Sequence, residues 1–366
     1  MVRKYFTFNY RGRTEGKTLL TGIRKQDCTL YITGFYEPSS SSVSYIYKEE
    51  STSSLAISFL YIGTLKQAKK NEGTWIDLSF HGKNTNLYGP NYVPERELIQ
   101  TVGNYFTGTN DSVLLGCLYQ TLYESNNQKQ KDKNQEEQTK GKWTIIVPPF
   151  GNSTLNTICH SVNGGLVVGN YDTTENSNIS KAFIYDIYTS NYYDIVIPNM
   201  QILSISAYGI ILKNKEKEKK IYTICGGYIE RVEEGSKAYM VDFDLKKKRF
   251  TNFRSFSYPI KTQANKPSFV THFDGISYDE KKDKYYLTGD YSNPPCLSQG
   301  CKNQISKEIG NLEGAFVATV EGKGEVKWET LSYMSPSILS GNSIAKDIVV
   351  GVYATQDNTY GYISYT

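Results

Sequence analysis

The feature that most constrains the fold of this chain is a Gly-x-Tyr motif that recurs six times at nearly even intervals. Each copy follows a short run of strand-forming residues, such as Leu166-Val167-Val168. Successive motif tyrosines lie 69, 66, 57, 63 and 62 residues apart. Such a period predicts repeated structural units that bury their faces by stacking on one another. The six copies are Gly34-Phe35-Tyr36, Gly103-Asn104-Tyr105, Gly169-Asn170-Tyr171, Gly226-Gly227-Tyr228, Gly289-Asp290-Tyr291 and Gly351-Val352-Tyr353.

The residues around the motif also repeat, which makes the match more specific than Gly-x-Tyr alone. Upstream lies a small residue followed by Ile or Val, as in Gly275-Ile276, although the second repeat (Asn86 to Val93) departs from this step. Downstream come an aromatic-rich strand, such as Tyr45-Ile46-Tyr47 or Phe183-Ile184-Tyr185, and a further strand that opens on a large aromatic residue, such as Trp75. Each unit therefore contains four predicted strands.

Four short antiparallel strands per unit are typical of a β-propeller blade. The sixth unit ends after three strands, whereas a spare aromatic strand, Lys4-Tyr5-Phe6-Thr7-Phe8, precedes the first unit. We therefore expect an all-β, six-bladed propeller whose last blade is closed by the N-terminal strand. Two stacked β-sandwiches are the alternative, but they do not explain why a missing strand at one end is matched by a surplus strand at the other. The expected single domain covers residues 1–366, with blades over about 17–80, 85–150, 155–199, 203–260, 267–334, and 338–366 plus 3–10.

The repeat resembles the HAF-type repeats of microbial β-propeller proteins. The resemblance is carried best by Lys181-Ala182-Phe183-Ile184-Tyr185 through Ile197-Pro198, and a second time by Gly314-Ala315-Phe316. The family's His before Ala-Phe is absent, because Lys181, Lys237 and Gly314 stand at that place. The resemblance implies a propeller and implies little about activity, since one fold hosts many functions.

Composition limits the classes of partner. The chain contains 31 Tyr, 15 Phe and 3 Trp, which suits strands better than helical bundles. A net charge of +4, from 41 basic and 37 acidic residues, does not favour nucleic acid as a partner. No apolar stretch reaches the roughly 20 residues that span a bilayer, so we expect no membrane span. We also expect a monomer.

The strongest candidate site residues come from their position in the repeat. The innermost strand of each blade lines the central channel, and if the small-Ile/Val step opens that strand, the residues just before the step form a ring at the axial mouth. These five polar residues are Thr21, His160, Tyr208, Asp274 and Asn342. They are predicted to bind a ligand, or to hydrogen-bond one another and plug the channel with water.

Histidine chemistry offers one further candidate. His272 and Asp274 flank Phe273, and a strand would place both side chains on one face, so they are predicted to pair or to be satisfied separately by local hydrogen bonds. The chain has only two other histidines, His81 and His160, and no spacing typical of a zinc site. The sequence therefore predicts neither a metal nor a cofactor.

The cysteines bear on the compartment. Cys28, Cys117, Cys159 and Cys225 lie in or beside predicted strands, where a free cysteine acts as a small buried hydrophobic residue. Cys296 and Cys301 flank a turn-rich loop in which a disulfide can form under oxidising conditions. This pair favours a secreted or extracytoplasmic protein, although no signal peptide is visible in the chain.

Two hypotheses of function follow. The leading one is a propeller scaffold that binds a glycan, peptide, protein or small molecule through its axial-mouth residues (the ring and His272) and its tyrosine-rich loops. The alternative is a metal-independent lyase, hydrolase or cyclase in which His160, Tyr208 and Asp274 act at the channel mouth. The sequence does not decide whether the protein is an enzyme.

Overall fold

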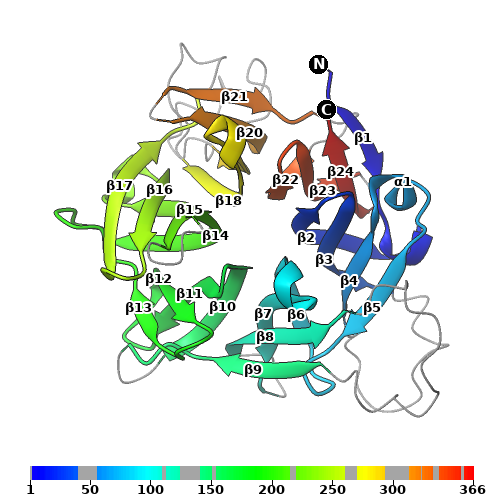
Figure 1. Ribbon diagram of the computed structural model, residues 1–366, viewed down its shortest axis with the longest axis horizontal. Helices are drawn as coiled ribbons and strands as arrows, with labels where there is room; N and C mark the ends of the chain where they lie inside the picture. The colour runs from blue at the N-terminus through cyan, green and yellow to red at the C-terminus, as the bar shows by residue number, and fades with distance from the viewer. Residues whose placement is uncertain are drawn as a thin grey trace, which may run out of the picture.

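The computed structural model describes residues 2–39, 56–108, 113–123, 141–150, 154–214, 220–259, 270–292, 313–322, 324–332, 338–355 and 358–366. In this part of the chain, four-stranded antiparallel sheets are arranged in a ring around a central axis (Figure 1). There are six such sheets, so the protein is a six-bladed β-propeller, as predicted.

In blades 1 to 5 the four strands follow one another from the innermost to the outermost. Blade 6 also has its first strand innermost, but its outermost strand comes from the N-terminus of the chain. Blade 1 contains β2 (Lys17–Gln26), β3 (Thr29–Glu37), β4 (Ile57–Thr64) and β5 (Thr74–Leu78). Blade 2 contains β6 (Thr85–Val93), β7 (Leu98–Phe106), β8 (Leu114–Leu122) and β9 (Lys142–Ile146). Blade 3 contains β10 (Thr154–Asn163), β11 (Leu166–Thr173), β12 (Asn176–Asp186) and β13 (Tyr192–Asp194).

The second half of the ring has the same design. Blade 4 contains β14 (Ser204–Asn214), β15 (Ile221–Ile229), β16 (Lys237–Asp244) and β17 (Arg249–Phe256). Blade 5 contains β18 (Val270–Asp279), β19 (Lys284–Ser292), β20 (Glu313–Glu321) and β21 (Val326–Thr330). Blade 6 contains β22 (Ile338–Ala345), β23 (Ile348–Ala354), β24 (Thr359–Tyr365) and β1 (Lys4–Thr7).

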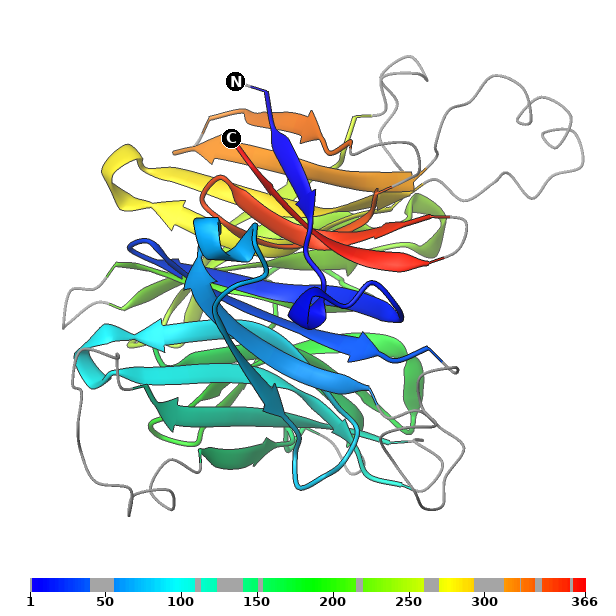
Figure 2. The same ribbon diagram turned by 90° about the vertical axis from the view of Figure 1, so that its right-hand side faces the viewer.

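The predicted closure of the ring is confirmed. Strand β1 pairs antiparallel with β24, from Lys4 opposite Tyr365 to Thr7 opposite Tyr362, and Figure 2 shows the two ends of the chain side by side. The Thr7 hydroxyl lies 2.7 Å from the hydroxyl of Tyr353, the last motif tyrosine. Arg3 also forms an ion pair of 3.0 Å with Glu329 in blade 5, so the N-terminal segment contacts two blades.

The hydrophobic core lies between the blades rather than in one central mass. Each of the six interfaces between neighbouring blades contains its own cluster of buried apolar side chains. Between blades 6 and 1, for example, Ile363 and Val350 pack in the same cluster as Leu20 and Ile32. Because both faces of most blades are buried in this way, a single blade would not be stable alone.

The glycine of the repeated motif has a steric cause. At each of the six glycines, on the second strand of its blade, an added Cβ would collide with a backbone carbonyl oxygen of the first strand. At Gly226 the colliding atom belongs to Ser206, and at Gly103 it belongs to Asn86. The motif therefore marks the place where two strands of one blade approach too closely for any side chain.

Three details of the sequence prediction need correction. The third strand of blade 1 is β4, whereas Tyr45-Ile46-Tyr47 lies outside the described residues. The small-Ile/Val step lies within the innermost strands rather than at their start, since β18 begins at Val270 and the step is Gly275-Ile276. Cys28 is exposed in a turn and is not a buried hydrophobic residue, unlike Cys117, Cys159 and Cys225.

Among the described residues, no helix is long and apolar enough to cross a membrane.

Candidate site in the central channel

The five predicted ring residues share a structural position. In the innermost strands the pairing register shifts at these residues, which is the mark of a β-bulge. His160, for example, is the extra residue between Cys159 and Ser161, and Asp274 is the extra residue between Phe273 and Gly275. All five are half-buried and lie mid-strand, so they belong to the interior of the channel and not to a loop at its mouth.

The second blade contributes Tyr88, which sequence reasoning missed. The register of β6 shifts between Leu87 and Pro90, and the Tyr88 ring lies 5.0 Å from the His160 ring. The step is disguised there because Pro90 stands in place of Ile or Val. One sequence signal was available: Gly89 precedes the motif glycine Gly103 by 14 residues, as Gly275 precedes Gly289.

One side of the channel interior is aromatic. The His160 ring contacts Tyr208 edge-to-face, with 4.8 Å between ring centroids, and Tyr208 in turn lies 5.7 Å from His272. Burial lowers the pKa of His160 to about 3, because desolvation disfavours the imidazolium. His160 is therefore neutral at physiological pH.

Two ring residues are held by backbone atoms of the neighbouring blade. The Thr21 hydroxyl donates to the Leu87 carbonyl oxygen over 2.6 Å. The Asn342 amide donates to the Leu20 carbonyl oxygen over 2.6 Å. These two side chains therefore link blades at the axis.

The predicted His272–Asp274 pair is present, with 3.0 Å between Nδ1 and Oδ1. A third residue joins it: Asp290 of β19 lies opposite His272 in the register, and ligand-capable atoms of all three residues lie within 4.8 Å of one another. Burial opposes protonation of His272, but the Asp274 carboxylate outweighs it and raises the pKa of His272. Burial and the nearby Asp274 raise the pKa of Asp290.

A second ring lies three residues further along each innermost strand. Its members, in blade order, are Arg24, Asn91, Asn163, Ile211, Ser277 and Ala345. Arg24 is the one charged residue of this ring, and its guanidinium reaches across the axis. It donates to the Ser161 hydroxyl over 3.0 Å, to the Ile210 carbonyl over 3.0 Å and to the Ile276 carbonyl over 3.3 Å, so one side chain joins four blades.

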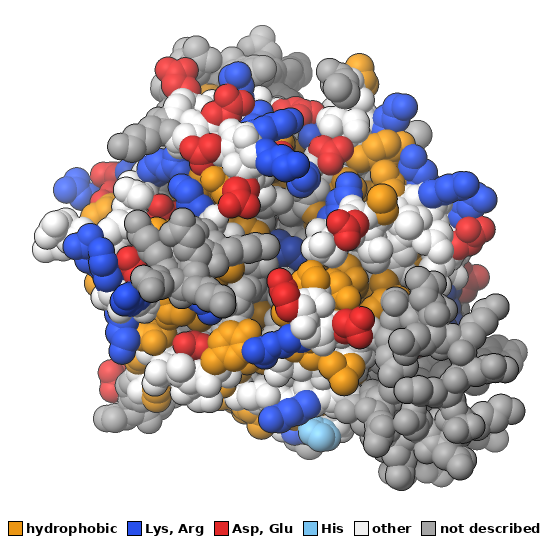
Figure 3. All heavy atoms as spheres, viewed as in Figure 1, with side chains coloured by type: hydrophobic (Ala, Val, Ile, Leu, Met, Phe, Trp, Pro, Cys, Tyr) orange, Lys and Arg blue, Asp and Glu red, His pale blue; other side chains and the backbone are white. Residues whose placement is uncertain are grey.

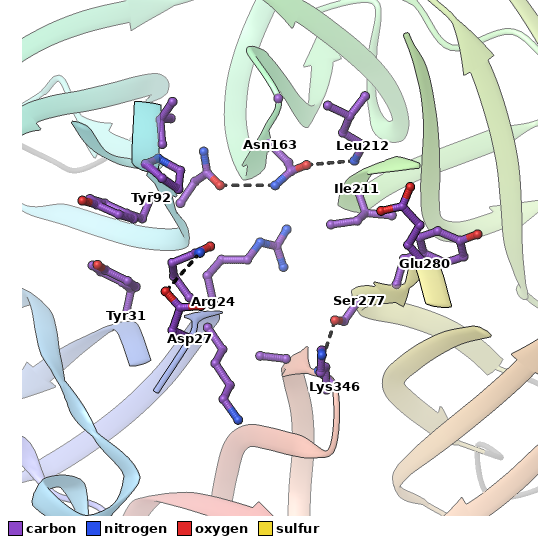
Figure 4. A pocket seen from close by; sticks show the side chains of 18 of the residues that line it. Arg24, Asp27, Tyr31, Tyr92, Asn163, Ile211, Leu212, Ser277, Glu280 and Lys346 are labelled. Atoms are coloured by element: carbon purple, nitrogen blue, oxygen red, sulfur yellow. Dashed lines mark hydrogen bonds between the residues drawn. The ribbon is translucent and has the colours of Figure 1, made fainter. Parts of the chain in front are cut away.

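Beyond Arg24 the channel opens into a pocket of about 920 Å³ (Figure 4). All six members of the second ring line it, together with residues of the turns that join the first and second strands of blades 1, 2, 3, 5 and 6, and with Leu212 and Lys213 near the end of β14 in blade 4. In Figure 4 the Arg24 side chain extends toward the middle of the pocket, while Tyr31 and Tyr92 stand side by side at its edge. These two rings stack with 5.2 Å between centroids and 11° between planes.

The pocket is lined by charges of both signs, but Arg24 at its inner end has no carboxylate partner among the described residues. Four basic residues (Arg24, Lys25, Lys213 and Lys346) and three acidic residues (Asp27, Glu95 and Glu280) line it. Figure 3 shows basic and acidic side chains intermixed around the centre of the face viewed in Figure 1. Arg24 forms no ion pair with any described residue, and its Nε atom is buried without a hydrogen-bond partner there. Burial lowers the pKa of Arg24 to about 10, which leaves it cationic at neutral pH.

Comparison with solved structures supports the fold. Trypanosoma rangeli sialidase in complex with sialic acid superposes with a TM-score of 0.54 and 9% sequence identity, over 100% of this chain and 59% of the sialidase chain. The same sialidase with 2,3-difluorosialic acid, a covalent intermediate, gives the same TM-score and sequence identity, over 99% of this chain and 59% of the sialidase chain. Penicillium chrysogenum α-L-arabinanase complexed with arabinobiose superposes with a TM-score of 0.47 and 11% sequence identity, over 100% of this chain and 98% of the arabinanase chain.

This chain therefore spans less than two thirds of the sialidase chain, and at such identities the likeness shows the propeller fold alone. No family model matches the sequence, and no curated protein matches it.

The remaining candidates of the sequence analysis lie elsewhere. His81 is exposed in the turn that joins β5 of blade 1 to β6 of blade 2, outside the innermost strands that carry the ring residues. Cys296 and Cys301 lie outside the described residues, so the predicted disulfide stays a prediction.

Proposed function

We propose that this propeller is a binding protein whose axial pocket takes a small anionic ligand, with a carboxylate-bearing saccharide as the ligand class. The observation that carries the proposal is Arg24, a cation without a carboxylate partner among the described residues, at the inner end of a pocket of about 920 Å³. Pockets that bind small molecules have volumes of about 300–1,000 Å³.

The energetics favour an anion. A buried charge without a counter-charge is costly, and a ligand carboxylate that enters the pocket restores the missing partner. Three of the five guanidinium N–H groups are used by Ser161, Ile210 and Ile276. These bonds fix the guanidinium before a ligand arrives, which reduces the entropy lost on binding.

The saccharide part of the proposal rests on the polar lining of the pocket and on the shared fold. The pocket offers amide and hydroxyl groups, including Asn163 and Ser277, that suit sugar hydroxyls. The sialidase that shares the fold was solved with sialic acid, a carboxylated sugar. The membership in HAF-type proteins, the monomeric state and the extracytoplasmic location stay predictions.

The test compares glucuronate with glucose, two probes that differ in one carboxylate, by isothermal titration calorimetry on the full chain. We expect glucuronate to bind at least tenfold more tightly than glucose, and Arg24→Met to remove that preference. Lys25→Met, which removes an exposed charge from the rim of the pocket, is the matched control and should change binding less than threefold. Equal affinity for the two sugars, or an Arg24→Met variant that keeps its native melting temperature and still prefers glucuronate, would refute the proposal.

The enzyme hypothesis places the chemistry on residues of the first ring, none of which lines the Arg24 pocket. His160 is neutral and lies against Tyr208, but a pKa of about 3 makes it a weak general base, and Asp274 is engaged with His272. A panel of aryl glycosides and esters tests it: turnover that disappears in His160→Gln supports catalysis, and no turnover of any substrate refutes it for these classes.

A further inference from the structure

We infer that His272, Asp274 and Asp290 form a binding site for a divalent transition-metal cation such as Zn²⁺, inside the channel and separate from the Arg24 pocket. None of the three residues lines that pocket. No metal was predicted from the sequence, because Asp290 comes from the neighbouring strand and His272-x-Asp274 alone is not a metal motif.

The first argument is the geometry of the donors. One imidazole nitrogen and two carboxylate oxygens lie within 4.8 Å of one another, and each of the three residues is half-buried. The Nδ1 and Oδ1 atoms of His272 and Asp274 are 3.0 Å apart. Two ligands about 2.0–2.2 Å from one tetrahedral Zn²⁺ ion lie about 3.3–3.6 Å apart, so the His272–Asp274 pair would open slightly and the third donor would move closer for all three to reach one ion.

The second argument is that the protein itself leaves this cluster unsatisfied. The Oδ2 atom of Asp274 is buried and has no hydrogen-bond partner among the described residues. No lysine or arginine of the described part of the chain forms an ion pair with Asp274 or Asp290. Two carboxylates therefore share one imidazole with no other cationic side chain paired to them, and a divalent cation that displaces the bound protons would supply their counter-charge.

The third argument is that the neighbouring blades hold the donors in place. Asp290 Oδ1 accepts a hydrogen bond of 2.9 Å from the Gly341 N–H of blade 6. On the blade 4 side His272 packs against Gly227, where an added Cβ would lie 2.9 Å from the His272 Cβ. Support of this kind orients metal ligands, and its loss typically weakens metal binding by 10–100-fold.

The choice of cation follows from the donor types. Imidazole nitrogen suits Zn²⁺ and related transition metals, whereas Mg²⁺ and Ca²⁺ prefer sites made entirely of oxygen. Three protein ligands also leave a coordination position for water, which would face the channel.

The experiment titrates the full, chelator-treated chain with Zn²⁺ alone and follows binding by calorimetry. We expect one Zn²⁺ per chain, and at least tenfold weaker binding in His272→Ala, Asp274→Asn and Asp290→Asn. His81→Ala removes an exposed histidine outside the cluster and should leave the affinity unchanged. Gly227→Ala should weaken binding without removing a ligand.

A second measurement does not depend on variants that fold. X-ray absorption of the Zn²⁺-loaded wild-type protein should show one imidazole nitrogen, with oxygen as the other ligands. The inference is overturned if the wild type binds no Zn²⁺, if His81→Ala abolishes binding while the three ligand variants keep it, or if the absorption spectrum shows sulfur or several imidazole ligands. Tighter binding of Ca²⁺ than of Zn²⁺ would refute the assigned class of cation.

Discussion

At the scale of single residues, the channel interior shows how the same kind of position serves different purposes. The bulge residues occupy equivalent places in the innermost strands, but Thr21 and Asn342 hold neighbouring blades together through backbone carbonyls, whereas Asp274 takes part in a cluster of titratable groups. His160 differs again, because it is packed between Tyr88 and Tyr208 and forms no ion pair with any residue that the structure describes. Identity and surroundings, and not position alone, decide the role of each ring residue.

The packing of His160 predicts a pH dependence of stability. Its pKa is about 3 in the folded protein and about 6.5 when unfolded, so the unfolded state binds the extra proton first. Stability is therefore full above pH 6.5 and falls as the pH drops from 6.5 toward 3. Between pH 7.5 and pH 5 this group costs about 2 kcal/mol of unfolding free energy.

The measurement is urea denaturation of wild type and His160→Gln at both pH values. The variant lacks the titrating group, so its loss of stability between the two should be about 2 kcal/mol smaller. Equal losses in the two proteins would mean that His160 is protonated in the folded state.

At the scale of the strand, the Gly-x-Tyr motif makes contacts between the second strand and other strands of the same blade. The glycine admits the carbonyl of the first strand in every blade. In blades 4 and 3 the tyrosine hydroxyl reaches the fourth strand, since Tyr228 donates to Ser255 over 2.8 Å and Tyr171 donates to Asp194 over 3.3 Å, whereas Tyr36 donates to the Glu15 carbonyl. In blades 3 and 4 the motif thus connects the second strand to the first and to the fourth. The steric requirement for glycine is common to all six blades and explains why the glycine recurs.

Gly226→Ala should be strongly destabilising for this reason. The new Cβ would meet the backbone of Ser206, which cannot rotate away as a side chain can, and overpacking of this kind costs about 1–3 kcal/mol or more. Gly82→Ala is the control: its Cβ would meet no atom within 4 Å, and the substitution strains only a left-handed backbone with φ of 76°. Chemical denaturation should give the larger loss at Gly226, and an equal or larger loss at Gly82 would contradict the steric account.

At the scale of the whole molecule, the ring depends on one non-covalent joint. Every other blade is formed by a continuous segment, but blade 6 combines the two ends of the chain. Strand β1 covers the edge of β24, and Phe8, which is fully buried, packs in the cluster between blades 6 and 1. Loss of this strand would expose a strand edge and an interface at once.

Deletion of residues 1–8 should therefore lower the melting temperature sharply and promote association through the exposed edge of β24. Thr7→Val is the mild counterpart, since it removes the hydroxyl that contacts Tyr353 and should cost about 1 kcal/mol. Thermal denaturation and size-exclusion chromatography measure both effects. A truncated chain that stays monomeric and equally stable would show that closure contributes little.

Much of this architecture was predictable because its signals are local. The number of blades, the four strands in each and the closing strand follow from a motif spacing and from strand patterns that the chain carries in linear order. The third strand of blade 1 was misplaced, because an aromatic run at Tyr45-Ile46-Tyr47 resembled the strand that Ile57–Thr64 forms. Tyr88 was missed because a proline replaced the expected Ile or Val in its step.

The sequence by itself determined that six similar units must pack in a ring, because close strand approach within each blade requires glycine at a regular interval. Only the tertiary structure decided what meets at the axis. Arg24 bonds to residues between 137 and 252 positions away, and Asp290 accepts a hydrogen bond from a blade that lies 51 residues further on. Such contacts depend on the bulge in each innermost strand and on the closure of the ring. Neither feature produces a local sequence pattern from which the contacted residue can be identified.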